Sequence, residues 1–162
     1  MPLENPKIIN SKDELKSLVK NARTRKKIVV FSNGCFDIIH PGHIFILEQA
    51  KAKGDILIVG LNSDSSIKNF KSSDRPICKQ DDRAYVLAGL TCVDHIIIFD
   101  EDTPEKLIIY INPDILVKGK DYEDKEIAGT KHMIANNKKI ELVDIIEGKS
   151  TSHIIKNIQK TN

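Results

Sequence analysis

Residues 28–43 read IVVFSNGCFDIIHPGH: a short apolar run, a loop that contains Gly34, and the start of a helical pattern. An apolar run of this length is typical of a strand buried in a parallel sheet. A helix that begins directly after such a loop offers unpaired backbone N–H groups and a partial positive charge to an anion. Because open α/β sheets bind their ligands at the carboxyl ends of the strands, we predict a phosphate-binding loop here.

The rest of the chain repeats this alternation. Further apolar runs typical of strands lie at 55–61, 95–99, 114–117 and 140–145. Helical patterns lie at 42–53, 81–90, 103–111 and about 125–136, and a last helix begins near residue 150. This order predicts a single α/β domain with a doubly wound, Rossmann-like parallel sheet of about five strands. We expect residues 1–27 to form a helical extension that packs on a domain of residues 28–162.

Polar residues predict two helix starts and one loop. Ser11 followed by Glu14 predicts a capping box in the extension. Thr103 before Pro104 predicts an N-cap with proline at the first helical position. The polar stretch 65–80 is predicted to be the longest surface loop, and to be poorly ordered without a ligand.

The composition excludes several function classes. The 162 residues carry 25 Lys and Arg against 23 Asp and Glu, and the net charge of +2 argues against a dedicated nucleic-acid surface. No apolar run approaches the roughly 18 residues of a membrane helix, and the first ten residues lack a secretory signal pattern. The cysteines Cys35, Cys78 and Cys92 lack metal-ligand spacing. We therefore expect a cytoplasmic protein with reduced thiols and with no membrane or nucleic-acid partner.

Two histidines stand at the start of the helix that follows the loop. His40 and His43 are three residues apart and flank a Pro-Gly turn, so both imidazoles can donate to phosphate oxygens. Such donors suit nucleotidyl transfer, in which stabilising charge on the α-phosphate is the main task. The alternative is that His40 caps the helix and His43 packs on it. A second helix start, GKSTS at 148–152, offers hydroxyls that cap free N–H groups or bind phosphate.

These motifs carry a resemblance to a known superfamily. GCFDIIHPGH is similar to the GxFDxxHxGH signature of the HxGH nucleotidyltransferases, and GKSTS is similar to the turn that opens their last helix. Between the motifs, residues 60–122 resemble the heptose 1-phosphate adenylyltransferases, which make an ADP-activated heptose for the lipopolysaccharide inner core of Gram-negative bacteria. The resemblance covers about residues 11–158. It implies transfer of AMP from ATP to a sugar 1-phosphate with Mg²⁺, a homodimer, and a separate sugar kinase that supplies the substrate.

The resemblance also implies roles for individual residues. His40, His43 and Lys71 would be catalytic, the last by binding the departing phosphates from a loop at 65–80 that closes over the triphosphate. The implied nucleotide-binding residues are Asn33, Gly34, Cys35, Phe36, Asp37, Asn62, Asp64, Arg83, Lys118, Gly119, Asp121, Ser150, Thr151 and Ser152. Mg²⁺ would be bound mainly through the triphosphate, with Asp37 as the candidate protein ligand. Arg75, in the same loop, is expected to be solvated rather than bound.

Two alternatives stay open. A cytidylyltransferase that acts on glycerol 3-phosphate or a similar alcohol phosphate shares the chemistry. That group carries an arginine before the glutamate of the last turn, which is absent before Glu147, although Lys149 could replace its charge. It also carries a lysine where Phe45 stands. Against the adenylyltransferases, Lys120 replaces a glycine and Ser152 a threonine. A non-catalytic nucleotide-binding module is the second alternative, although a mere binder has no need of donors aimed at a transition state.

Overall fold

The computed structural model describes residues 4–72 and 74–160, and Ser73 of the predicted loop lies outside them. It is an α/β fold with one parallel sheet in the order β1-β4-β3-β2-β5-β6. The strands are β1 (Ile8–Ile9), β2 (Val29–Gly34), β3 (Ile56–Asn62), β4 (His95–Phe99), β5 (Ile115–Gly119) and β6 (Lys139–Val143). The five predicted strands and the fold class are confirmed. Strand β1 was not predicted, because two residues are too few to show a periodic pattern.

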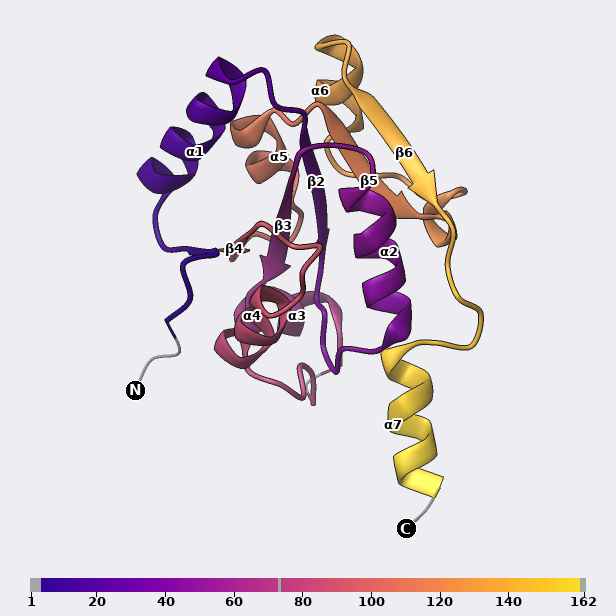
Figure 1. Cartoon of the computed structure of the whole chain (residues 1–162). Helices are drawn as coiled ribbons and strands as arrows, with labels where there is room; N and C mark the ends of the chain where they lie inside the picture. The colour runs from indigo at the N-terminus through magenta and orange to yellow at the C-terminus, as the bar shows by residue number, and fades with distance from the viewer. Residues whose placement is uncertain (1–3, 73, 161–162) are drawn as a thin grey trace.

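The helices cover both faces of the sheet. They are α1 (Lys12–Thr24), α2 (Pro41–Lys51), α3 (Asp64–Phe70), α4 (Gln80–Ala88), α5 (Glu105–Ile111), α6 (Thr130–Ala135) and α7 (Thr151–Lys160), with a 3₁₀ turn η1 (Lys120–Tyr122). Apolar residues of α2 and α4 share one core with Val30 and Leu57, while those of α1, α5 and α6 share another with Val29 and Ile58. Neighbouring strand residues thus point to opposite faces, as a doubly wound sheet requires. Figure 1 shows α1 and α2 on opposite sides of β2.

The described part of the predicted extension, residues 4–27, packs into the core that α1 shares with α5 and α6. Strand β1 pairs with β4, and Leu15, Val19 and Ala22 of α1 are buried with the residues of α5. One half of the capping box is confirmed: Ser11 Oγ accepts from the Glu14 amide at 3.1 Å. The other half differs, because the Glu14 carboxylate accepts from the amide of Asn10 and not from that of Ser11. A domain boundary at residue 27 stays a prediction.

Three predictions about local structure are wrong. Residues 65–70 are not loop, because Ser63 Oγ accepts from the Ser66 amide at 3.1 Å and starts α3, in which Ile67 is fully buried. Thr103 is not an N-cap: α5 begins one residue later, with Pro104 at the cap position and no side-chain bond there. Helix α6 is shorter than predicted, because Gly129 in the left-handed region (φ 85°) immediately precedes it.

The carboxyl end of the chain differs from the rest of the fold. Helix α7 projects away from the sheet (yellow in Figure 1), and its ten residues, all described, include none that is buried. Across the described residues, no helix combines the length and the apolar character that a membrane crossing demands.

Candidate active site

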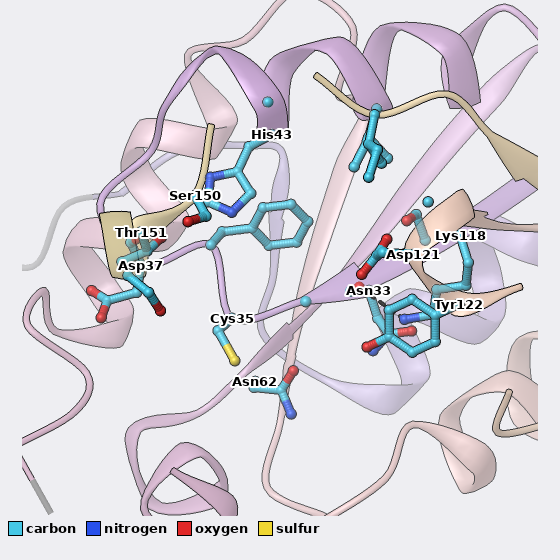
Figure 2. Close-up of a pocket in the computed structure, with 18 of the residues that line it drawn as sticks. Asn33, Cys35, Asp37, His43, Asn62, Lys118, Asp121, Tyr122, Ser150 and Thr151 are labelled. Carbon is cyan, nitrogen blue, oxygen red and sulfur yellow. Dashed lines mark hydrogen bonds between the residues drawn. The ribbon is translucent and has the colours of Figure 1, made fainter. Parts of the chain in front are cut away.

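A cleft of about 1190 Å³ opens at the carboxyl ends of β2, β3 and β5. Six parts of the chain line it among the described residues: 32–46, Asn62, 70–72 with Arg75, 102–104, 118–128 and 145–152. It therefore brings the predicted Lys71 together with both predicted phosphate motifs, which lie more than 100 residues apart in the sequence. Figure 2 shows two groups of side chains: His43, Ser150, Thr151 and Asp37 in one, and Asn33, Lys118, Asp121 and Tyr122 in the other.

His40 and His43 form a stacked pair at the start of α2. His40 is the N-cap, and its Nδ1 accepts from the Gly42 amide at 3.1 Å. Since Nδ1 accepts, the neutral ring carries its hydrogen on Nε2. The two rings stack with centroids 3.8 Å apart, and the edge of Phe36 meets His43 at 5.2 Å. The capping role and the donor role are thus compatible, because each uses a different nitrogen of His40.

Burial keeps both imidazoles neutral near neutral pH. It lowers the pKa of His40, with a contribution from the charge of Lys149, and it lowers the pKa of His43 to about 4. His43 Nδ1 is buried and has no hydrogen-bond partner among the described residues. Two charged imidazoles at stacking distance would also repel each other. The pair can therefore supply N–H donors to a phosphate but no full positive charge.

The depressed pKa of His43 predicts a pH dependence of stability. The ordinary histidine pKa of 6.5 applies to the unfolded chain and the value of about 4 to the folded chain. Between them the unfolded state binds more protons, so the free energy of unfolding should fall as the pH drops from 6.5 toward 4. Urea unfolding at pH 5 and pH 7 should show a smaller difference for His43→Leu than for the wild type. The exposed His153→Leu is the control, and an identical pH response in all three proteins would refute the assignment.

Asp37 is tied to the protein by hydrogen bonds, and its predicted role as a metal ligand stays a prediction. Its side chain is 1% exposed and accepts three hydrogen bonds: from Arg75 Nε at 2.7 Å and from the amides of Ile77 and Cys78 at 2.9 Å each. Burial raises the pKa of this carboxyl, but the bonds from the two amides and Arg75 outweigh that effect and lower it. Both oxygens are thus occupied by the protein. Among the described residues, no group of three or more His, Cys, Asp or Glu is placed to hold a metal ion.

Arg75 is buried, which contradicts the expected solvated side chain. It is 7% exposed and forms the ion pair with Asp37. Lys71, by contrast, is exposed at the end of α3 and lines the cleft that contains the two histidines.

Asp64 and Arg83, both predicted to bind nucleotide, are absent from the described lining of the cleft. Arg83 is 2% exposed and donates to the carbonyls of Cys78 and Asn62 at 3.0 and 2.9 Å, and to the Asp64 carboxylate at 2.7 Å. It donates to the carbonyl of Cys35 as well. Arg83 therefore links the signature loop (residues 34–43) to the end of β3 and the start of α4 through its side-chain hydrogen bonds. Asn62 does line the cleft, and its side chain donates to Ser66.

A buried lysine marks the other end of the cleft. Lys118 is 7% exposed, donates to the Asn33 carbonyl at 3.1 Å and lies 4.8 Å from the ring centroid of Tyr122. Burial lowers the pKa of Lys118 to about 8. A Cβ on Gly119 would lie 2.5 Å from Asp121 Oδ1 and 2.9 Å from Ile145 Cγ2, so a larger residue there would have to displace these side chains. The side-chain oxygen of Asn33 is buried without a partner in the described structure.

The last predicted motif meets the first at the start of α7. Thr151 Oγ1 donates to the carbonyl of Asp37, and Ser150 Oγ caps the amide of His153 at 3.2 Å. A Cβ on Gly42 would lie 3.0 Å from the Lys149 carbonyl, so the two helix starts are in close contact. Both hydroxyls thus have structural partners while Ser150, Thr151 and Ser152 line the cleft. All three cysteines are free, and burial raises the pKa of Cys35, which also lines the cleft.

Several lining residues were missed by sequence reasoning. They include Ile46, Phe70, Ser72, Asp102, Thr103, Pro104, Tyr122 and Ile145. Residues 102–104 follow β4, and the rule that ligands bind beyond the carboxyl ends of strands could have found them. The apolar residues Ile46 and Ile145 carry no signal of a site.

Comparison with known proteins is consistent with this geometry. The model of the cytidylyltransferase-like family matches residues 31–157. Proteins named bifunctional protein HldE from Wolinella succinogenes and Helicobacter pylori (strain Shi470) are 49% and 50% identical to this chain over 156 and 157 residues. The alignments cover 96% and 97% of this chain but 32% of each relative, so the chain spans about a third of the length of the curated relatives it matches.

Two solved structures share the fold. The lipopolysaccharide core biosynthesis protein from Thermoplasma volcanium superposes with a TM-score of 0.61 and 30% identity, over 76% of this chain and 99% of its own. Pantoate-beta-alanine ligase from Francisella tularensis superposes with a TM-score of 0.63 over 93% of this chain and 72% of its own; at 17% identity it shows a likeness of fold alone. The family model and the HldE relatives both align across the signature loop and the last motif. The chain therefore belongs to the cytidylyltransferase-like family, and it is a nucleotidyltransferase.

Proposed function

We propose that this chain transfers AMP from ATP to a sugar 1-phosphate, heptose 1-phosphate in particular, and releases pyrophosphate. The observation that carries the proposal is the stacked pair of neutral histidines at the start of α2, in one cleft with Lys71 and the start of α7. The choice of sugar and nucleotide rests on the resemblance of residues 60–122 and on the HldE relatives. A role in lipopolysaccharide synthesis, as the printed name of the Thermoplasma volcanium protein suggests for that protein, belongs to the same proposal.

The reaction needs no protein nucleophile. An oxygen of the acceptor phosphate attacks the α-phosphorus of ATP, the new P–O bond forms, and the bond to the bridging oxygen of the leaving pyrophosphate breaks. His40 Nε2–H and His43 stabilise the charge on the α-phosphate, together with the positive end of the α2 dipole. Lys71 neutralises the charge that the pyrophosphate gains. Mg²⁺ would be held mainly by the triphosphate oxygens, where it would supply charge neutralisation, because the Asp37 carboxylate already accepts three hydrogen bonds from the protein.

Lys71 provides a test of this mechanism. Lys71→Ala should lower kcat by about tenfold while it weakens ATP affinity much less, because the contact forms fully only as pyrophosphate departs. The matched control is Lys68→Ala, an exposed lysine of α3 that is absent from the described lining of the cleft. Steady-state pyrophosphate release gives kcat, and calorimetry gives the ATP affinity. Equal losses in both variants, or unchanged turnover in Lys71→Ala, would remove Lys71 from the mechanism.

The nearest rival is a cytidylyltransferase that acts on glycerol 3-phosphate or a similar alcohol phosphate, as the family description allows. The position two residues before Glu147 carries Ile145 rather than arginine, and this isoleucine lines the cleft. A pyrophosphate-release assay with ATP, CTP, GTP and UTP against heptose 1-phosphate, other sugar phosphates and glycerol 3-phosphate separates the two. We expect ATP with heptose 1-phosphate to be fastest. Faster turnover with CTP, or turnover on glycerol 3-phosphate alone, would transfer the protein to the rival class.

Turnover in that assay would also exclude a non-catalytic nucleotide-binding module. The cytoplasmic location, the homodimer and the separate sugar kinase stay predictions.

A further inference from the structure

The segment between α3 and α4 has exposed residues at the rim of the cleft, Lys71 and Ser72, and a buried residue, Arg75, that anchors it to the interior. Lys71 and Ser72 are exposed on the cleft, whereas Arg75, only a few residues on, is 7% exposed. A buried arginine is rare outside a specific pairing. Its partner is Asp37, the acidic residue of the signature loop, at 2.7 Å.

Asp37 joins three parts of the site. Its three donors all lie in residues 75–78, and its own carbonyl accepts from Thr151 at the start of α7. On either side of it, Phe36 (φ 47°) and Ile38 (φ 51°) adopt the left-handed region, which is uncommon for bulky side chains. Such a backbone persists only where its surroundings hold it. The bonds from residues 75–78 hold it here, together with those from Thr151 to the Asp37 carbonyl and from Arg83 to the Cys35 carbonyl.

The same anchor limits where Lys71 can lie. On one side, the Lys71 amide donates to the Ile67 carbonyl at 2.9 Å and ends α3. On the other, the Arg75 amide donates to the Ser72 carbonyl at 3.0 Å and closes a turn directly after Lys71. The position of Lys71 relative to the histidines therefore depends on α3 and on the ion pair of Arg75 with Asp37.

We propose that Arg75 is a positioning residue: its ion pair with Asp37 holds the 71–78 segment so that Lys71 faces the leaving pyrophosphate. This inference rests on the proposed function for the role of Lys71. The inference adds to the proposed function that the Asp37–Arg75 ion pair connects the signature loop to the segment of Lys71 at the rim of the cleft. It also limits the predicted loop closure, because residues 75–78 are bound to the signature loop and only the rim near Lys71 is left to move.

A double-mutant cycle separates positioning from direct contact with the substrate. Arg75→Met keeps the length of the side chain but removes the ion pair, and it should lower kcat by about tenfold in the wild-type background. In a Lys71→Ala background the same change should cost less than about twofold, since its effect passes through Lys71. Arg75→Lys should restore part of kcat, because it keeps a charge near Asp37. A full loss in both backgrounds would mean that the guanidinium itself binds substrate, and an unchanged kcat would mean that the pair positions nothing; either result overturns the proposal.

Hydrogen exchange gives a readout that does not require turnover. In Arg75→Met without nucleotide, the amides of Ile77 and Cys78 should exchange about tenfold faster than in the wild type, and in Arg75→Lys the increase should be smaller. The control is Lys138→Met, which removes an ion pair of 2.6 Å with Asp114 at the amino ends of β5 and β6, away from the cleft, and should leave these amides and kcat unchanged. If the wild type shows no turnover with any nucleotide, the proposed function fails, but the exchange rates still test whether the Asp37–Arg75 ion pair holds residues 75–78. Unchanged exchange at both amides in Arg75→Met would overturn that part of the proposal.

Discussion

Replacing His43 by Ala lowers kcat by about a hundredfold or more and leaves the fold intact, since one lost transition-state donor typically costs about 3 kcal/mol. The ring lies against His40 and Phe36 in the cleft, so its removal deletes a donor rather than a core contact of the sheet. Steady-state pyrophosphate release measures the effect. His153→Ala, an exposed histidine of α7, should retain the wild-type rate.

His40 requires a variant that separates its two tasks. His40→Ser keeps a side-chain oxygen at the N-cap of α2, so its stability should stay close to that of the wild type, while kcat falls by about a hundredfold. His40→Ala should show the same kcat and, in addition, a free energy of unfolding that is lower by about 1 kcal/mol. Near-normal turnover in His43→Ala and His40→Ser would mean that the pair has a structural role alone.

Arg83→Met should have the largest effect on stability. The change removes the donor of three backbone carbonyls and leaves Asp64 without its ion pair. We expect the free energy of unfolding to fall by about 3 kcal/mol and Tm by roughly 10 °C. Arg23→Met is the matched control, because Arg23 also donates to backbone carbonyls, those of Ile111 and Asn112, but from an exposed position. Its cost should stay below about 1 kcal/mol.

Calorimetric unfolding and ATP binding together decide the role of Arg83. If Arg83 serves mainly to link the signature loop to β3 and α4, Arg83→Met should lower the free energy of unfolding much more than it lowers the affinity for ATP. A variant that is as stable as the wild type but no longer binds ATP would return Arg83 to the nucleotide-binding residues that the sequence suggested.

The fold was predictable from the sequence because it depends on local patterns. The apolar runs of the five longer strands and the Gly34 loop can be read along the chain without knowledge of what they contact. Helix α3 was missed because its polar serines, which are also typical of loops, serve as a cap at Ser63 and as a buried donor at Ser66.

The site was predictable at the level of loops but not of side-chain direction. His40 and His43 lie at the start of α2 and Lys118 lies near the end of β5, where their motifs place them. Arg75 and Arg83 have long side chains that can reach the cleft or the interior from the same backbone position. Their direction is decided by partners far away in the sequence: Arg75 pairs with a residue 38 positions earlier, and Arg83 donates to the carbonyl of Cys35, 48 positions earlier. No local pattern encodes such pairings.

The most direct test of the proposed transfer follows the two ends of ATP separately. The purified chain is incubated with Mg²⁺, heptose 1-phosphate and ATP labelled either at the α- or at the γ-phosphate, and the products are separated by chromatography. The proposed reaction predicts that the α-label appears in an ADP-sugar and the γ-label in pyrophosphate, in equal amounts, and that both signals fall together in His43→Ala. Release of the γ-label as inorganic phosphate, or an α-label that remains in ATP, would contradict adenylyl transfer to a sugar phosphate.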